Sequence, residues 1–338
     1  MQQNLRFGVI GTGGIASDFA RALSASKRCS VVNVSGSSAD KARAFADRYR
    51  IPSASASLEE MLRDPKVEAV YVATPHPAHE AQAIACIDAG KHVLCEKPIT
   101  IDATSAARVL ERGKARGVLV MEAFMYRTHP LLKELVARLK AGAIGEIRHV
   151  RADFAFRVPR DPKGRLFDKK LGGGGILDVG GYPVSFVRLI AGLVEGTPFA
   201  EPTRLQAVGY LGPTGADEIA TALLNFRSGL TATVTCGVHH AAGTTTVVFG
   251  EQGRIVLPDP WIPQSQRHAL ETGFSIIRDD QPEEVVSVKT ELATYAIEAE
   301  TMADMLPALE PVWPAMSHAD TLGNMRVLDA WMAALNTG

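Results

Sequence analysis

Cysteine is scarce in this sequence, and its spacing excludes the usual cysteine frameworks. The four cysteines lie within apolar stretches and form no CxxC pair, which argues against a zinc ribbon or a dithiol redox motif. They are Cys29, Cys86, Cys95 and Cys236. We expect four buried free thiols, as in a protein of the reducing cytoplasm.

Charge of either sign is not in excess. Lysine and arginine number 36 against 37 aspartates and glutamates, so the formal net charge is -1, and no bulk field attracts nucleic acid or an anionic membrane. We find no apolar run of the length that spans a bilayer. A strand-like segment begins already at Leu5, which leaves no room for a signal peptide. We therefore expect a cytoplasmic protein whose partner is a small molecule.

Clusters of metal-ligating residues are also lacking. The nine histidines do not group with acids at ligand spacing. His76 and His79, on either side of Pro77, come closest, but we interpret them as loop and helix-start residues. The sequence predicts no metal site.

What the sequence does contain is enough apolar residues for two domains. It has 338 residues, of which 46% are hydrophobic and 22% charged, as in globular proteins of more than one core. We predict a boundary near residue 125, with a first domain at 1–125 and a second at 126–338. A C-terminal helix at 320–335 would be able to pack back on the first domain.

The first half alternates short apolar runs with amphipathic ones, which is typical of an α/β, doubly wound parallel sheet. The predicted strands are Leu5–Ile10, Val31–Ser35, Ala69–Ala73, His92–Cys95 and Val118–Glu122. The predicted helices are Ile15–Ser26, Asp40–Tyr49, His79–Ala89 and Ile101–Arg116, with Asp40 as an N-cap and Gly90 ending the third.

The second half changes character after a helix near Leu131–Lys140. Strand-like segments now follow one another without helices between them, and Ser228-Gly229 is a hairpin signal. These segments are Ile147–Phe156, Leu205–Tyr210, Ile219–Phe226, Leu230–Cys236 and Thr244–Phe249. We predict an α+β domain with a largely antiparallel sheet.

A glycine-rich turn joins the first predicted strand to the first helix. Its sequence, Gly11–Ala16, has the form GxGxxA, in which the glycines allow a tight turn and a close approach of the backbone to a pyrophosphate at a helix N-terminus. A merely tight turn would not need both Gly11 and Gly13. The residues we expect to hold a dinucleotide here are Gly11, Thr12, Gly13, Gly14 and Ile15.

The end of the second strand bears on the choice of nucleotide. A site for NAD usually places an acid there for the ribose hydroxyl, but this chain has no acid before Asp40. Small hydroxyls with basic residues nearby suit a 2′-phosphate better, so NADP is favoured over NAD. The residues concerned are Ser35, Ser37, Ser38, Lys41 and Arg43.

Two further loops follow buried strands at the edge where open α/β sheets place their ligands. One is Thr74-Pro75-His76 and the other is Glu96-Lys97-Pro98. Lys97 follows an apolar strand and precedes a proline, so partial desolvation would suit it to proton transfer. The alternative is an ordinary surface lysine. We count Thr74, Pro75, His76, His79, Glu96 and Lys97 among the cofactor-binding candidates.

The glycine-rich stretch from Gly172 to Pro183 is a third candidate. If it is helical, Asp178 and Tyr182 lie four residues apart and share a face. Pro183 should end or kink such a helix near Tyr182. The open alternative is that Asp178 caps the helix and Tyr182 belongs to the core.

These motifs resemble the Gfo/Idh/MocA oxidoreductases over essentially the whole chain. The most specific is AGKHVLCEKP at Ala89–Pro98, and the Gly11 loop, the Ala73–Pro75 turn and the Gly173–Tyr182 stretch agree with it. The resemblance implies a Rossmann domain, a second domain with an open sheet that often forms a dimer interface, and a sugar, polyol or related substrate. It thus implies a homodimer or higher homo-oligomer.

Many members carry histidine where this chain has Tyr182, and the tyrosine form is similar to dihydrodiol dehydrogenases, D-xylose dehydrogenases and glucose–fructose oxidoreductase. By that match Lys97 and Tyr182 handle the proton, with Asp178 orienting Lys97 or binding a hydroxyl. The nearby Lys97 cation would favour the phenolate of Tyr182. The resemblance also places Arg127 near the cofactor, and the following residues near the substrate: His129, Arg165 and Phe167.

The reaction implied is reversible hydride transfer between nicotinamide C4 and a carbinol carbon. Which of Lys97 and Tyr182 is the base stays open at this point. A non-catalytic sensor of the same fold is the rival hypothesis, and the same chemistry on an aryl dihydrodiol or an anhydrosugar is another. One departure concerns the nucleotide: NADP-linked relatives often place arginine where this chain has Ser37.

Overall fold

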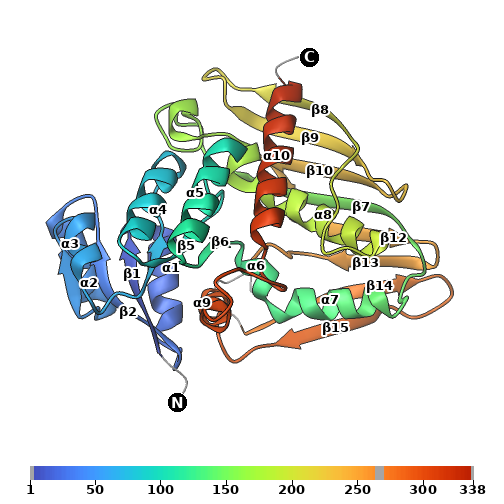
Figure 1. Ribbon diagram of the computed structural model, residues 1–338. Helices are drawn as coiled ribbons and strands as arrows, with labels where there is room; N and C mark the ends of the chain where they lie inside the picture. The colour runs from blue at the N-terminus through green and yellow to red at the C-terminus, as the bar shows by residue number, and fades with distance from the viewer. Residues whose placement is uncertain (1–3, 263–269, 336–338) are drawn as a thin grey trace.

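The computed structural model describes residues 4–262 and 270–335, which form two sheets with helices around them (Figure 1). The first sheet is parallel, with the strand order β3-β2-β1-β4-β5-β6. Its strands are β1 (Leu5–Ile10), β2 (Cys29–Ser35), β3 (Ser53–Ser55), β4 (Ala69–Val72), β5 (His92–Glu96) and β6 (Val120–Ala123). The predicted doubly wound sheet is confirmed.

The helices of this half alternate with its strands. They are α1 (Gly14–Leu23), α2 (Ala39–Tyr49), α3 (Leu58–Arg63), α4 (His79–Asp88), preceded by the short η1 (His76–Ala78), and α5 (Ala103–Arg116). All four residues of β4 are buried, and so is most of β1 and β5. Such runs bury both faces of a parallel strand. All four cysteines are buried and free, as expected.

The prediction of Asp40 as the N-cap of α2 is wrong. The helix begins one residue earlier, and the Ser38 hydroxyl accepts a hydrogen bond from the backbone N–H of Lys41. Serine and aspartate are comparable caps, and Ser38 comes first along the chain. Asp40 instead lies exposed in the first helical turn, where a negative charge is favourable.

The second sheet is mainly antiparallel, and among the described residues its strand order is β15-β14-β13-β12-β7-β10-β9-β8, with β11 beside β7. Only the β7–β10 pair among these is parallel. The strands are β7 (Ile147–Arg157), β8 (Arg204–Leu211), β9 (Asp217–Asn225), β10 (Thr231–Gly237), β11 (His239–Gly243), β12 (Thr246–Gly250), β13 (Gly253–Leu257), β14 (Glu271–Arg278) and β15 (Glu284–Lys289). The predicted α+β class is confirmed.

Helices cover one face of this sheet (Figure 1). They are α7 (Pro130–Lys140), α8 (Gly181–Glu195) and α10 (His318–Leu335), and short turns precede them: α6 (Met125–Thr128), η2 (Lys169–Leu171) and the π-helical η3 (Ile176–Gly180). The opposite face carries exposed apolar side chains such as Val208, Leu223 and Val285.

Two C-terminal helices return to the first half of the chain. α9 (Thr294–Met305) packs against α1 and α6, and α10 packs against α5 as well as β8. Glu300 on α9 accepts a hydrogen bond from Ser26, at 2.6 Å. The two halves are therefore held together by the end of the chain and not only by the 124–146 connection. The boundary at residue 125 stays a prediction.

The stretch from Lys169 to Glu195 corrects one expectation from the sequence. By length and composition it could cross a membrane, although the sequence was expected to hold no such run. Its apolar window is 94% buried inside the protein. It is therefore a core element, and a buried core helix meets the same criteria of length and hydropathy.

Candidate active site

The Gly11 turn has the geometry that a pyrophosphate needs. Gly11 has a φ of +107°, and a Cβ on it would lie 2.5 Å from the carbonyl oxygen of Ala73, so only glycine fits. Gly13 is the N-cap of α1 and makes no side-chain cap. A Cβ on Gly13 or Gly14 would meet no atom within 4 Å. The first backbone N–H groups of α1 are therefore not covered by a side chain and can donate hydrogen bonds to a bound anion.

The residues around this turn extend the cradle toward β2. The Ser35 carbonyl accepts a hydrogen bond from the Gly11 N–H, at 2.8 Å. Thr12 lies against Gly36, on which a Cβ would come within 3.0 Å of the Thr12 methyl carbon. Ile15 is half-buried and packs on the core. The turn and the end of β2 thus form one continuous surface.

Cationic and hydroxyl groups gather at the end of β2. Ser37 and Ser38 are exposed, and Lys41 Nζ donates a hydrogen bond to Ser37 Oγ, at 3.2 Å. The negative charge nearest in sequence, Asp40, is on the first turn of α2. An ammonium group that already lies on the serine hydroxyl favours a ligand with an added phosphate over a bare ribose hydroxyl.

The loops after β4 and β5 are joined through His79. Its two ring nitrogens face the carbonyl oxygens of Pro98, at 2.9 Å, and Thr74, at 2.8 Å, and the side chain is fully buried. We therefore assign the His79 side chain to holding these loops together, and its role in binding the cofactor stays a prediction. Pro75, between the two, is exposed at the edge of the sheet.

Lys97 and Asp178 form the centre of the site. Lys97 Nζ donates to the backbone carbonyl of Asp178 and lies 4.0 Å from the Asp178 carboxylate oxygen Oδ1. Arg165 reaches the same oxygen at 2.7 Å, and its side chain remains 47% exposed. Burial would raise the pKa of Asp178, but the charges of Lys97 and Arg165 outweigh it and hold the pKa below its ordinary value.

The alternative reading of Asp178 as a helix cap is wrong. The N-cap position of η3 is Gly175, and the Asp178 side chain points to the two cations. Pro183 does not end the helix either, because α8 runs through it to Glu195. The proline follows closely on the π-helical turn η3, so the helix changes its winding just before Pro183 and then continues as a regular α-helix. The helical interpretation of the Asp178–Tyr182 spacing is confirmed.

His76 lies beside this cluster as a neutral imidazole. Its Nδ1 is 3.4 Å from the carbonyl oxygen of Gly172, so it joins the β4 loop to the glycine-rich stretch. Burial and the neighbouring Lys97 charge lower its pKa to about 3. His76 can therefore donate or accept a hydrogen bond at neutral pH without adding charge to the site.

Tyr182 presents its ring, not its hydroxyl, to Lys97. The ammonium lies 5.3 Å from the ring centroid, whereas the hydroxyl is directed at Met125 Sδ, at 3.4 Å. Phe124 and Phe154 pack edge-on against the ring, at 5.1 and 5.2 Å. Burial raises the pKa of Tyr182 well above its ordinary value. The expected stabilisation of its phenolate is therefore wrong for this geometry.

Four other candidates are held by partners of their own. Glu96 turns into the core, where the Tyr71 hydroxyl and the Lys97 backbone N–H, at 3.3 Å, donate to it and burial raises its pKa. Arg127 is ion-paired with Asp320 at 3.0 Å. These two contacts hold both side chains in place, and their role in binding the cofactor stays a prediction.

His129 caps α7 by accepting from the Leu131 N–H, at 3.0 Å. Its ring is fully buried, and burial lowers its pKa to about 4. Phe167 is also buried and stands edge-on to the ring of His239, at 5.8 Å. Of the predicted substrate residues, the structure brings Arg165, Asp178 and Tyr182 to Lys97, and it does not bring His129 or Phe167 there.

Sequence reasoning missed Asp217, which anchors the glycine-rich stretch. This residue begins β9, and its Oδ2 accepts from the Ile176 N–H at 2.7 Å. Burial raises its pKa to about 6. A lone aspartate at the start of a strand gives no local signal, because its partner lies 41 residues away. No group of three or more potential metal ligands occurs among residues 4–262 and 270–335.

The sequence matches two family profiles, one for each half. Residues 5–124 match the Gfo/Idh/MocA oxidoreductase family with an NAD-binding Rossmann fold, and residues 132–256 match a Gfo/Idh/MocA C-terminal domain. The trans-1,2-dihydrobenzene-1,2-diol dehydrogenase of Mus musculus is 36% identical over 77% of this chain and 76% of its own length.

Two other relatives match almost from end to end. An uncharacterized oxidoreductase of Rhizobium meliloti is 32% identical over 99% of this chain and 98% of its own. The crystal structure of a 3-ketoreductase from Actinomadura kijaniata, in complex with NADP and TDP-benzene, superposes with a TM-score of 0.85 at 29% identity. That comparison covers 99% of this chain and 98% of the ketoreductase.

Proposed function

Since this chain belongs to the Gfo/Idh/MocA family of NAD(P)-binding oxidoreductases, we propose that it transfers a hydride between NADP and a CH–OH carbon of a sugar, polyol or related diol. The observation that carries this proposal is the Lys97–Asp178–Arg165 group at the edge of the parallel sheet. Hydroxyl oxidation needs both a proton acceptor and a nucleotide site, and this edge holds residues suited to each.

The residues present fit the cofactor. The open Gly13–Gly14 backbone at the α1 N-terminus would hold the pyrophosphate. Ser37, Ser38 and Lys41 would hold a 2′-phosphate. When bound, the nicotinamide supplies the hydride acceptor or donor. The relative with NADP in its crystal structure supports the choice of NADP over NAD.

Lys97 is the group we assign to proton transfer. When a carbinol carbon loses a hydride, its hydroxyl must lose a proton, and a base within hydrogen-bond reach contributes roughly 10²–10⁴-fold. Lys97 Nζ is held by the Asp178 carbonyl, and the side chain stays 15% exposed, so it can reach a substrate oxygen. In the oxidation Lys97 accepts this proton as the neutral amine and becomes the ammonium, and in the reverse direction that ammonium returns the proton to a carbonyl oxygen.

Tyr182 supports Lys97 by packing its ring against the Lys97 side chain. Its ring face attracts the ammonium, as cation–π contacts do, while its hydroxyl is buried against Met125. Asp178 fixes the position of Lys97 and, with Arg165, offers polar atoms to the remaining substrate hydroxyls. Structures of the related ketoreductase carry substitutions of a single lysine or a single tyrosine.

We also propose a cytoplasmic homodimer formed through the uncovered face of the large sheet. Strand register places Leu223, Thr233, Arg151, Val247, Val256, Ser275 and Val285 in one row across it. Leu223 and Val285, at the ends of this row, are 52% and 73% exposed. A broad sheet face with exposed apolar side chains is typical of an association surface.

The test is a titration with NADPH and NADH, then an absorbance screen at the nicotinamide band against dihydrodiols, aldoses, polyols, anhydrosugars and nucleotide-linked ketosugars. We expect tighter binding of NADPH and turnover of at least one compound class. Tight binding without turnover would instead favour a non-catalytic sensor, and absence of binding would overturn the proposal.

Lys97→Met tests the assignment of the proton-transfer group. Turnover should fall by at least about two orders of magnitude, on the scale of general-base catalysis, while the Kd for NADPH stays near that of the wild type. Lys163→Met, at an exposed position of the same loop as Arg165, should change neither quantity. Retained turnover in the Lys97 variant would remove this residue from the mechanism.

A further inference from the structure

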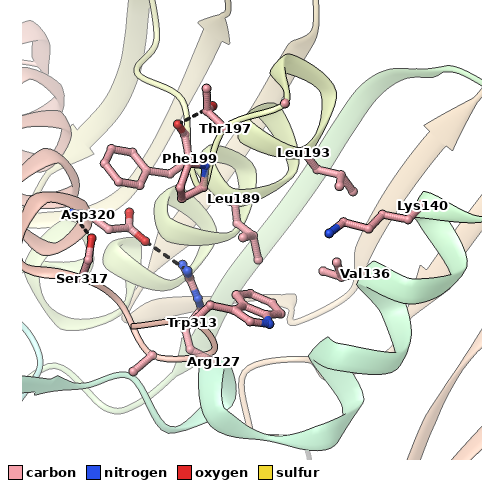
Figure 2. A pocket seen from close by; sticks show the side chains of 13 residues that line it. Arg127, Val136, Lys140, Leu189, Leu193, Thr197, Phe199, Trp313, Ser317 and Asp320 are labelled. Carbon is pink, nitrogen blue, oxygen red and sulfur yellow. Dashed lines mark hydrogen bonds and ion pairs between the residues drawn. The ribbon is translucent and has the colours of Figure 1, made fainter. Parts of the chain in front are cut away.

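We propose a second ligand site, separate from the Lys97 group, that binds a small molecule with an aromatic or apolar body and one anionic group. It is a cavity of about 450 Å³ between α7, the end of α8 and the segment 313–320 (Figure 2). This volume is within the range of small-molecule pockets. Lys97, Asp178 and Tyr182 do not line it, so it goes beyond the proposed function.

The walls of the cavity are mainly apolar. They are formed by Val136, Leu189, Leu193, Pro198, Phe199 and Trp313. Trp313 is 45% exposed, although large aromatic side chains are usually buried. An exposed indole beside aliphatic side chains offers a flat surface on which an aromatic ring can stack. We therefore infer that the main part of the ligand is aromatic or apolar.

The anionic group follows from Lys140 and Arg127. Figure 2 shows Lys140 extending into the cavity from α7, opposite Arg127. Within residues 4–262 and 270–335, Lys140 has no ion-pair partner. Arg127 is 2% exposed, and its Nε lacks a hydrogen-bond partner among these residues. Asp320 is shared between Arg127 and Arg188, and Glu201 also pairs with Arg188, so these four charges balance and the cation left for an anionic ligand is Lys140.

The cavity is connected to the active site through one serine. Arg127 donates to the Ser185 carbonyl at 3.4 Å, and Ser185 Oγ donates to the Tyr182 carbonyl at 2.9 Å. A ligand that binds Arg127 would therefore change the hydrogen bond between Arg127 and α8, the helix that carries Tyr182.

The test uses anilinonaphthalene sulfonate, an aromatic monoanion, with saturating NADP to occupy the nucleotide site. We expect one equivalent to bind and to quench Trp313 most strongly, because Trp313 lines the cavity and Trp261 and Trp331 do not. Its uncharged counterpart phenylnaphthylamine should bind at least about tenfold more weakly, since a charge-assisted hydrogen bond is lost. Equal binding of the two probes would overturn the anionic part of the proposal.

Variants locate the bound probe. Lys140→Gln should weaken binding of the sulfonate about tenfold, whereas Lys133→Gln, an exposed lysine on the same helix that does not line the cavity, should not. Leu193→Trp should fill the cavity and abolish binding while NADPH binding and turnover persist. Binding that survives both the Lys140 and Leu193 changes, or that never saturates at one equivalent, would overturn the site.

Discussion

At the residue scale, Asp178 shows how a buried carboxylate can be kept charged. Its side chain is 6% exposed, and burial alone would favour the protonated acid. Lys97 and Arg165 lie on its Oδ1 from two different segments, and together they lower its pKa. A charged Asp178 in turn holds the Lys97 ammonium in place, so each group depends on the other.

Ser37 is the residue at which we expect the nucleotide preference to be set. Ser37→Asp would place a carboxylate beside the Lys41 ammonium and repel a 2′-phosphate, which is specificity through an unfavourable contact. We expect the ratio of the Kd values for NADPH and NADH to shift toward NADH by at least about tenfold, or about 1.4 kcal/mol. Fluorescence titration of both nucleotides measures it.

The matched control is Ala44→Asp, at an exposed position farther along the same helix. It adds the same charge to α2 without reaching the end of β2, so the ratio should stay near the wild-type value. If both variants leave the ratio unchanged, the ribose does not lie at the end of β2.

At the scale of elements, the four consecutive glycines have a packing reason. A Cβ on Gly174 would lie 2.1 Å from Asp217 Oδ1, and a Cβ on Gly175 would lie 2.9 Å from Gly237 Cα. The stretch therefore passes directly against the start of β9 and the end of β10. Glycine is required because the backbones approach so closely, and this contact places η3, with Asp178, under Lys97.

Asp217 should consequently act as a positioning residue. Asp217→Ala removes the acceptor of the Ile176 N–H, and we expect kcat to fall at least about tenfold because misplacement by about 1 Å can cost 10²-fold. The Kd for NADPH should be unchanged, since the Gly11 turn is on another element. Asp217→Asn keeps an acceptor oxygen and should recover most of the loss.

The split between kcat and nucleotide affinity distinguishes positioning from general destabilisation. Thermal melting of both variants shows whether the fold is intact at the assay temperature. A parallel fall of kcat and NADPH affinity, or the same loss in the asparagine as in the alanine variant, would contradict the positioning role.

Elements with a strong periodic pattern could be predicted from the sequence. β1 and α2 agree with the predicted ranges to within one residue, and β4 and α10 to within two. β3 and α3 were not predicted, because three and six residues are too short for a periodic signal. β13 to β15 and α9 were not predicted either. The three strands are stabilised by the neighbouring strands of the sheet, and α9 is stabilised by packing against α1. The local sequence pattern does not reveal such contacts between distant segments.

The candidate site also has features that the sequence predicts and features that it does not. The sequence shows the spacing of Asp178 and Tyr182 and the position of Lys97 at a strand end, and the structure brings these three residues together. The sequence does not show the direction of the Tyr182 hydroxyl or the pairing of Arg127 with Asp320. The Arg127 contact spans 193 residues, and only the return of α10 creates it.

At the scale of the whole molecule, the return of the C-terminal helices encloses several carboxyl groups. Glu96, Glu122 and Glu298 are all buried, and Glu298 has neither oxygen hydrogen-bonded among the described residues. Burial raises the pKa of each of them. The folded chain therefore retains protons that the unfolded chain would release, and its stability must depend on pH.

Glu122 gives this dependence a test, because burial raises its pKa from 4.5 to about 7. Between these values the unfolded chain binds fewer protons than the folded chain, so the stability that Glu122 contributes is lost as pH rises, by at most about 3 kcal/mol. Glu122→Gln keeps an acceptor for the Ile99 N–H, now 2.9 Å from the carboxylate, and cannot ionise.

We expect Glu122→Gln to melt close to the wild type near pH 5 and several degrees higher near pH 8, since the wild type alone must then carry a buried charge. Glu111→Gln, at an exposed position of α5, controls for the loss of one negative charge and should show no such difference between the two pH values. A melting difference that is constant with pH would mean that Glu122 is already ionised in the folded protein at pH 5. The burial of this carboxyl by α10 and the 99–102 loop would then have to be offset by a partner, and Thr321, a neighbour on α10 that lowers its pKa, would be the residue to replace next.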